Sequence, residues 1–399
     1  MSTWKKVWGS LEIPWGAQVG SLEDITQKIW IQNAWTAHAV QVRFCNAYGR
    51  EPLVLERVSA GVWDREKKQV TKIVPITADG SERITIEPGT AFYSDEAALS
   101  LTPEYDIVIS AYFKSAQKID SVCQTWCAQG FRTSFCGGDA VSSAFLGMQT
   151  TLQVLPSFAR DAVPCNAAAG INGLKICTDR PPVTLACFGD SITHMGYYFD
   201  PLREMVQRHR PGEYALLNYG IGGNRLLFDD CYVEEIIGHG KCFGQAGISR
   251  FVRDVYIEDT PDTVFFMEGV NDCTHAFAFG CPNEVPTGEM LFNGMKQIIE
   301  TSHKNKSKIY VSTVMPFGCF GESFREKAEC IRQDFNQRIR ENSALADGLI
   351  DLDKVMRMPN APDKMQEGCH IGDGVHPNTE GGRRIARAIF EHLFKGEMR

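Results

Sequence analysis

Several features of membrane and nucleic-acid-binding proteins are missing from this sequence of 399 residues. No apolar run approaches the roughly 18 residues that a membrane-spanning helix needs. The 41 basic residues are outnumbered by 49 acidic ones, so the formal net charge is −8 and no positive excess exists to hold phosphate backbones or anionic lipid. We therefore expect neither a nucleic-acid partner nor a membrane partner.

Signals of export and of metal binding are also missing. The stretch Val7–Gly20 lacks the apolar core and the small-residue cleavage site of a secretory signal peptide. The 14 cysteines include no C-x-x-C pair, which disfavours a zinc site. The sets that could still ligate zinc are Cys123 with Cys127 and Cys136, and Cys273 with His275. We expect a cytoplasmic protein with reduced thiols, most of them buried.

Tryptophan is absent after residue 126, although seven tryptophans precede that point. The two parts of the chain therefore differ in kind. In the first part, short stretches such as Gln27–Ile31, Val40–Phe44 and Arg83–Glu87 alternate or run apolar between turn-rich pieces, which predicts an antiparallel β-sandwich. The tryptophans would fill its core or line an interface between domains, and a platform that stacks sugars is the alternative.

After Asp179–Pro182 the pattern changes to alternating strands and helices. The predicted buried strands are Val183–Phe188, Tyr214–Leu217, Thr263–Met267, Lys308–Val314 and Leu349–Leu352. The predicted helices are Pro201–Arg210, Gly247–Tyr256, Glu289–His303, Glu326–Asn342 and Glu380–Phe394, and the expected long loops are Leu226–Gly247 and Cys273–Pro286. This alternation predicts a parallel sheet covered by helices, with working residues at the carboxyl ends of its strands. We thus predict two domains, residues 1–180 and 181–399.

A serine, a histidine and an aspartate each follow a predicted strand. Ser191 lies in a Gly-Asp-Ser sequence at the turn after the first strand of the second domain, where it could also be an ordinary helix N-cap. Asp373 and His376 stand three apart on a loop after the last strand, so the carboxylate can reach the imidazole Nδ1. Together they fit the nucleophile, the base and the orienting carboxylate of acyl transfer.

Hydrogen-bond donors follow two further strands. Closely spaced glycines, among them Gly222 and Gly223, leave main-chain amides uncovered after the second strand. Asn271 follows the third strand with a neutral side-chain amide, although alone it is a turn residue. With the Ser191 amide, these groups could stabilise an oxyanion. The G-x-S-x-G elbow of α/β-hydrolases and the P-loop are both absent.

At these residues the chain resembles the SGNH or GDSL-type hydrolases, whose four blocks carry serine, glycine, asparagine and histidine. The resemblance covers about Val183 to Arg399. More weakly, the N-terminal part is similar to the β-sandwich that precedes the catalytic domain in some bacterial carbohydrate esterases. The resemblance implies an α/β fold: a flavodoxin-like three-layer domain with a parallel sheet, preceded by an antiparallel, jelly-roll-like β-sandwich domain.

The resemblance also implies a serine esterase that needs no metal and no cofactor. Its catalytic residues would be Ser191, Asp373 and His376, and its oxyanion donors Ser191, Gly223 and Asn271, with Gly222 as the adjacent alternative to Gly223. The substrate would be a small-molecule or oligosaccharide acyl ester, above all a short acetyl ester on a carbohydrate. The alternatives are a short-chain lipase or lysophospholipase, and a catalytically silent carbohydrate-binding protein. His194 could contact substrate or pack against the loop beside it.

Overall fold

The structure is a computed structural model that describes residues 2–125, 131–145, 166–318 and 323–394. By its internal contacts the chain divides into two compact units. The N-terminal unit comprises Met1–Pro182, Arg210–Leu217 and Ile236–Gly238, and the C-terminal unit comprises Val183–His209, Asn218–Glu235 and His239–Arg399. No helix among the described residues combines the length and the apolar character needed to cross a bilayer.

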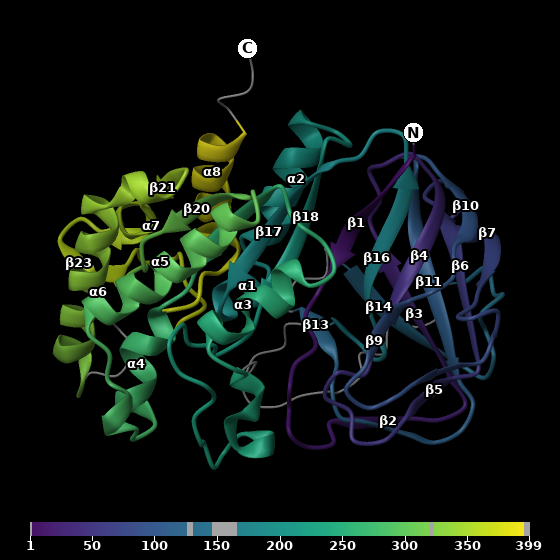
Figure 1. The fold of residues 1–399 in the computed structure, drawn as a ribbon, viewed down its shortest axis with the longest axis horizontal. Helices are drawn as coiled ribbons and strands as arrows, with labels where there is room; N and C mark the ends of the chain where they lie inside the picture. Colours follow the sequence, from purple (N-terminus) through teal and green to yellow (C-terminus); the bar gives the residue numbers. More distant parts are fainter. Residues whose placement is uncertain (1, 126–130, 146–165, 319–322, 395–399) are drawn as a thin grey trace. The chain divides into compact units, whose positions relative to one another are not determined.

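The N-terminal unit is built from two five-stranded sheets (Figure 1). The first has the order β1-β16-β4-β10, with β9 beside β4: β1 (Thr3–Gly9), β16 (Ile171–Thr178), β4 (Ala37–Cys45), β10 (Ala97–Leu101) and β9 (Ala91–Tyr93). The second has the order β14-β3-β11-β6-β7: β14 (Phe131–Gly137), β3 (Ile25–Ile31), β11 (Tyr105–Phe113), β6 (Arg57–Asp64) and β7 (Gln69–Ile76). Short pairs add β2 (Gly20–Leu22) with β12 (Gln117–Ile119), β5 (Leu53–Leu55) with β8 (Ile84–Ile86), and β13 (Cys123–Thr125) with β15 (Asn166–Ala168).

The long strands pass back and forth between these two sheets. Along the chain, with the short strand β9 left out, they change sheet at every step except from β6 to β7 and from β11 to β14, and the pairings described within the sheets are antiparallel. This order is that of a jelly roll in which β14 is an additional edge strand. Alternate residues of both sheets form one buried apolar cluster, as the period-two pattern requires. The predicted antiparallel sandwich is confirmed.

The tryptophans of this unit divide into two groups. Trp8, Trp15 and Trp35 are buried, and Trp8 and Trp35 belong to the apolar core cluster, so the interpretation of tryptophan as core filling is correct for these two. Trp4, Trp30 and Trp63 remain partly exposed, and Trp126 lies outside the described residues.

The C-terminal unit is centred on a five-stranded sheet with the order β18-β17-β19-β20-β21. Its strands are β18 (Tyr214–Gly220), β17 (Val183–Gly189), β19 (Thr263–Met267), β20 (Lys308–Ser312) and β21 (Gly348–Ile350). The pairings from β17 through β19 and β20 to β21 are parallel. In chain order the arrangement is 2-1-3-4-5, the flavodoxin-like order, as predicted.

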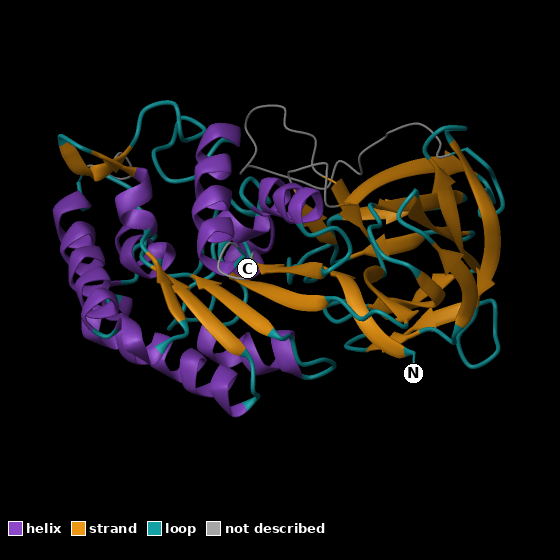
Figure 2. Ribbon diagram, turned by 90° about the horizontal axis from the view of Figure 1, so that it is seen from above, coloured by secondary structure: helices purple, strands orange, loops and turns teal. Residues whose placement is uncertain are grey.

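Helices lie on both faces of this sheet (Figure 2). They are α1 (Ser191–His194), α2 (Phe199–His209), α3 (Gly247–Tyr256), α4 (Val270–Ala278), α5 (Gly288–Lys304), α6 (Arg325–Glu341), α7 (Leu352–Met356) and α8 (Thr379–Leu393). Smaller elements are η1 (Ile237–Phe243), η2 (Pro282–Glu284), η3 (Ser343–Leu345), β22 (Arg357–Met358) and β23 (Ala361–Met365). Because helices cover both faces, β17 and β19 are buried almost throughout, which explains their continuous apolar sequences.

The five helices predicted from the sequence correspond to α2, α3, α5, α6 and α8 within two residues at each end. The expectation of a loop over Cys273–Pro286 is wrong for its first part, because α4 continues to Ala278. Nearly every side chain of α4 is buried, polar ones included, so its sequence has no amphipathic period to reveal a helix.

Candidate active site

Ser191 begins α1 directly after β17, at the carboxyl end of the sheet. Gly189 ends the strand, and a Cβ there would lie 2.3 Å from the Met267 carbonyl oxygen and 2.5 Å from Thr193 Oγ1, so only glycine permits this close approach. Asp190 caps the helix by accepting the Ile192 N–H at 2.9 Å. Burial raises the pKa of Asp190 to about 7. The position of Ser191 is therefore fixed by the close packing of Gly189 and by the helix cap of Asp190.

Ser191, His376 and Asp373 form one chain of hydrogen bonds. Ser191 Oγ is 2.8 Å from His376 Nε2, and His376 Nδ1 is 2.5 Å from Asp373 Oδ2. Because a carboxylate only accepts, Nδ1 carries the proton and Nε2 is left to accept the serine hydroxyl. The structure thus brings together three predicted site residues from two distant parts of the sequence.

The loop that carries His376 holds Asp373 in its ionised form. Asp373 Oδ1 accepts the main-chain N–H groups of Val375 and His376, both at 3.0 Å. Burial acts to raise the pKa of Asp373, but the hydrogen bond and charge of His376 and these two amides outweigh it and lower the pKa to about 2. Asp373 is consequently a carboxylate at neutral pH and a fixed acceptor for the imidazole.

The two candidate glycine amides differ in their partners. The Gly222 N–H donates to His194 Nδ1 at 3.1 Å. The Gly223 N–H has no hydrogen-bond partner within the described part of the chain. Gly223 has φ +74°, and a Cβ there would lie 2.0 Å from the Phe243 ring, so no other residue fits. The geometry favours Gly223 over Gly222 as a donor to a ligand and gives the buried His194 a role in holding this loop.

Asn271 lies in the first turn of α4, after Gly269, whose φ of +124° strongly favours glycine. Its Nδ2 donates one hydrogen to the Asn224 carbonyl oxygen at 2.8 Å. The other hydrogen of this amide has no partner among the described residues. Asn271 is therefore hydrogen-bonded to the loop that carries Gly223, and its second side-chain N–H remains able to donate to a ligand.

Asp272, the next residue, binds the same loop. Its two carboxylate oxygens accept the N–H groups of Leu226 and Leu227 at 2.7 and 3.0 Å. Burial raises the pKa of Asp272 to about 6. The start of α4 thus fixes the loop after β18 through two consecutive side chains.

A buried arginine that the sequence motifs do not include links three of these segments. Arg250, in α3, has no exposed surface. Its guanidinium donates to the carbonyl oxygens of Gly189 at 2.9 Å and Tyr219 at 3.2 Å, and to Asn224 Oδ1 at 2.7 Å. The group lies 4.0 Å from the centre of the Phe188 ring. Arg250 thereby ties the end of β17 to the end of β18 and the loop that follows it.

Two acidic side chains lie against the Arg250 guanidinium. Asp254 lies 3.1 Å from the guanidinium and Glu268, at the end of β19, lies 3.3 Å from it. Burial raises the pKa of Glu268 to about 8, although Arg250 acts in the opposite direction. The arginine and its partners come from separate elements, and no short motif in the sequence could have identified them.

The zinc alternatives find no support in the geometry. His275 Nδ1 approaches Cys231 Sγ at 3.8 Å, and burial lowers the pKa of His275 to about 3. Cys127 lies outside the described residues. Where the structure describes side chains, no three His, Cys, Asp or Glu residues gather as metal ligands.

Comparison with known proteins places this site in a family. The model of the GDSL-like lipase/acylhydrolase family matches residues 187–384, whereas no curated protein matches the chain. Similar solved structures include the acetyl xylan esterase AlAXEase, with 23% identity, 53% of this chain and 100% of that chain covered, and a TM-score of 0.41. A GDSL-like lipase from Bacteroides thetaiotaomicron VPI-5482 is 19% identical, with 55% of this chain and 93% of that chain covered and a TM-score of 0.40.

A catalytic mutant of an acetylxylan esterase from Geobacillus stearothermophilus is 18% identical, with 53% of this chain and 94% of that chain covered and a TM-score of 0.38. The family match confirms the resemblance found in the sequence motifs and covers the strand ends from which the site is built. Residues 187–384 are a domain of the GDSL-like lipase/acylhydrolase family, and the protein is a carboxylic ester hydrolase.

Proposed function

We propose that the protein hydrolyses short acyl esters, specifically acetyl esters of carbohydrates, with Ser191 as nucleophile, His376 as base and Asp373 as the residue that orients the base. The observation that carries this proposal is the continuous hydrogen-bonded chain from Ser191 Oγ through the imidazole to the Asp373 carboxylate. A serine whose hydroxyl faces an oriented imidazole is activated for attack on a carbonyl carbon.

In the first half of the reaction, Ser191 Oγ bonds to the ester carbonyl carbon while its proton passes to His376 Nε2. The carbonyl oxygen becomes an oxyanion, which accepts hydrogen bonds from the amides of Ser191 and Gly223 and from Asn271 Nδ2. His376 then gives its proton to the alcohol oxygen as the carbon–oxygen bond breaks. The alcohol leaves and the acyl group remains on Ser191.

In the second half, water replaces the alcohol. His376 Nε2 takes a proton from the water molecule while the water oxygen bonds to the acyl carbon. The three oxyanion donors again hydrogen-bond to the negatively charged oxygen. The bond to Ser191 breaks, Ser191 Oγ recovers the proton from His376, and the carboxylic acid is released. Asp373 stabilises the imidazolium formed in each half.

A small cavity lined by sequence neighbours of the catalytic residues, and not by those residues themselves, is the proposed place of the acyl group. Its volume is about 10 Å³, near the lower limit for one water molecule, so without rearrangement it has room only for a very small group. Its wall includes Ile192, Val270 and Val375, which are the sequence neighbours of Ser191, Asn271 and His376. The wall is completed in part by Val314 and Met315, from the loop after β20. A long acyl chain does not fit this cavity, so an acyl group that occupies it must be short.

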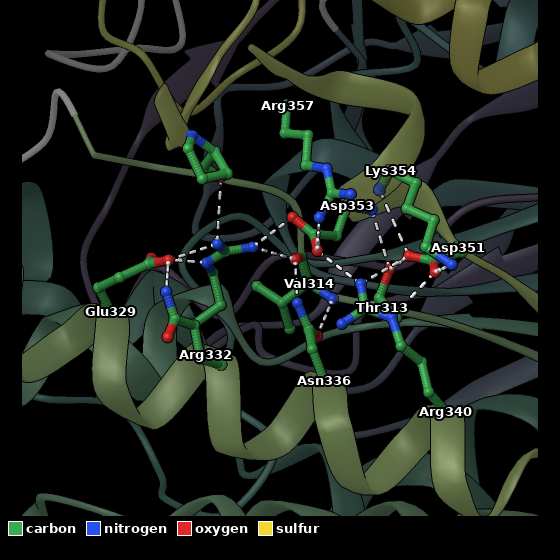
Figure 3. Close-up of polar contacts among 12 residues, drawn as sticks. Thr313, Val314, Glu329, Arg332, Asn336, Arg340, Asp351, Asp353, Lys354 and Arg357 are labelled. Carbon is green, nitrogen blue, oxygen red and sulfur yellow. Dashed lines mark hydrogen bonds and ion pairs between the residues drawn. The ribbon is translucent and has the colours of Figure 1, made fainter. Parts of the chain in front are cut away.

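A buried polar network holds the Val314 wall in place (Figure 3). Asn336 accepts the Val314 N–H and donates to the Val314 carbonyl oxygen, both at 2.8 Å. Arg332 donates to the same oxygen at 3.1 Å and is paired with Glu329 at 2.5 Å and Asp353 at 2.8 Å. Since both main-chain groups of Val314 are held from α6, this part of the wall cannot move without breaking these bonds.

The leaving alcohol is proposed to be a carbohydrate because a jelly roll, an architecture found among lectin domains, accompanies the hydrolase domain. The panel that tests the proposal contains p-nitrophenyl esters from acetyl to octanoyl and acetylated oligosaccharides. We expect kcat/KM to be highest for acetyl and to fall with each added methylene. A maximum at octanoyl would favour the lipase alternative, and release of no acetate from any oligosaccharide would exclude the proposed alcohol.

Met315→Ala is expected to shift this chain-length preference. Removing the methionine side chain enlarges the cavity, so the ratio of kcat/KM for butyryl over acetyl ester should rise on the order of tenfold. The matched control is Met295→Ala, which removes a buried methionine of α5 that does not line the cavity and should leave the ratio unchanged. Equal ratios in both variants would show that this cavity does not hold the acyl group.

Asn271→Ala is expected to lower kcat for p-nitrophenyl acetate by about 10²- to 10³-fold, because one oxyanion donor is lost. KM should change little, since the donor acts on charge that develops after binding. The control is Asn218→Ala, which removes a nearby amide that donates to the Thr193 carbonyl oxygen at 2.8 Å, and it should reduce kcat far less. Similar losses in the two variants would assign Asn271 a purely structural role.

A further inference from the structure

We propose that the N-terminal unit carries a carbohydrate-binding site of its own, on the outer face of the sheet β14-β3-β11-β6-β7, with Trp30 and Trp63 as its aromatic walls. Its ligand is a pyranose residue of an oligosaccharide chain. The proposal concerns binding and does not depend on the hydrolytic mechanism.

The strand register places the site residues on one face. Trp30 of β3 pairs with Arg132 of β14, and Trp63 of β6 pairs with Asp106 of β11. The residues on either side of Trp30, which are Ile29 and Ile31, belong to the sandwich core. Because successive side chains of a strand point to opposite faces, Trp30 and its cross-strand partner lie on the face away from that core. The same alternation applies to Asp106 and Trp63, whose neighbours Ile107 and Val62 are core residues.

This outer face is hollowed where these residues meet. A pocket of about 340 Å³ is lined by Trp30, Gln32, Trp63, Arg65, Asp106 and Arg132. The volume lies in the range of small-molecule sites and has room for a sugar ring. The fold has buried other tryptophans of this unit, such as Trp8 and Trp35. Two partly exposed indoles beside one pocket are therefore a specific feature of this face.

The polar groups of the pocket are held in fixed positions. Arg65 donates to both oxygens of the buried Asp106, at 3.0 and 2.5 Å, and to the Pro103 carbonyl oxygen at 3.0 Å. The guanidinium of Arg132 lies 4.8 Å from the centre of the Trp30 ring. Groups that are already ordered lose little conformational entropy when a ligand binds.

This combination matches the two kinds of surface on a pyranose. The C–H face of the ring packs against an indole, which offers a large, rigid apolar surface with little entropy to lose. The hydroxyl groups need planar donors and acceptors, which the guanidinium, carboxylate and amide groups of the pocket supply. With two arginines and one carboxylate the pocket has a positive excess, so a uronic acid residue is the pyranose we expect to bind most tightly.

The test is calorimetric titration of the full chain with non-acetylated oligosaccharides, neutral xylo- and gluco-oligosaccharides in one arm and oligogalacturonates in the other. We expect the tightest binding in the oligogalacturonate arm, and an affinity at least tenfold lower in Trp63→Ala and in Trp30→Ala. Hydrolysis of p-nitrophenyl acetate should be unchanged in both variants. Trp4→Ala, which alters a partly exposed tryptophan of the other sheet, is the matched control and should bind like the wild type.

Two results would overturn the proposal: no heat of binding in either arm at millimolar sugar, or binding that persists in both tryptophan variants. If a tryptophan variant does not fold, Arg132→Gln takes its place, because it changes a polar wall of the same pocket. It too should weaken binding by at least tenfold. If the wild-type protein bound oligosaccharides but hydrolysed no acyl ester, that result would contradict the proposed esterase function and not the proposed binding site.

Discussion

Ser191→Ala is expected to lower kcat for p-nitrophenyl acetate by roughly 10⁴- to 10⁶-fold while the protein remains folded. The variant keeps the imidazole, the carboxylate and the oxyanion donors but lacks the oxygen that forms the acyl-enzyme. Because serine differs from alanine by one oxygen and Ser191 keeps 8% of its surface exposed, the substitution leaves no large cavity. Steady-state kinetics and a thermal unfolding curve for each protein are the measurements.

The matched control for this experiment is Ser302→Ala. Ser302 is a fully buried serine of α5 whose hydroxyl donates to the Ile298 carbonyl oxygen at 2.9 Å, so its replacement removes a structural hydrogen bond only. Its kcat should stay within about twofold of the wild type, since it has no part in the proposed chemistry. A Ser191→Ala variant that retained a tenth of the wild-type kcat would refute Ser191 as the nucleophile.

The parts of the site that follow buried strands could be predicted from the sequence. Ser191 comes directly after β17, and Asn271 follows β19 by a few residues. An apolar run of a few residues between turn signals is visible in one sequence, and the carboxyl ends of parallel strands meet at one edge. Two strand ends recognised along the chain therefore imply two side chains near one another in space.

The parts that depend on packing could not be predicted in this way. The difference between Gly222 and Gly223 depends on His194, which accepts only the Gly222 amide. The hollow in the jelly roll depends on the register of β3, β11 and β6, which brings Trp30 and Trp63 to one face. Such relations join residues far apart in the chain, and no local periodicity encodes them.

Arg250 shows the same limit for a charged residue. In α3 it precedes Arg253 by one helical turn, and the two residues look alike in sequence. Yet Arg250 is fully buried, whereas the Arg253 side chain is 40% exposed and pairs with Asp254 at 2.7 Å. The difference arises from acceptors supplied by other segments, the Gly189 and Tyr219 carbonyl oxygens, which compensate the cost of removing one guanidinium from water.

Arg250→Met is consequently expected to lower the free energy of unfolding of the C-terminal unit by about 3–5 kcal/mol. The variant fills similar space but leaves buried carbonyl oxygens and the Glu268 carboxyl without their donor, and each such acceptor costs about 1–3 kcal/mol. Circular dichroism at 222 nm during denaturant unfolding measures the effect, since the described α-helices belong to this unit.

Two companion variants make this prediction specific. Arg253→Met, on the same helix, should cost no more than about 1 kcal/mol, because the Arg253 side chain is 40% exposed and Asp254 keeps its contact with Arg250. Arg250→Lys keeps the charge but lacks the planar set of donors that reaches Gly189, Tyr219 and Asn224 at once, so it should recover less than half of the loss. If Arg250→Lys were as stable as the wild type, the positive charge alone would account for the contribution of Arg250 to stability. Equal costs for Arg250→Met and Arg253→Met would show that the segments carrying Ser191 and Gly223 are held together without this arginine.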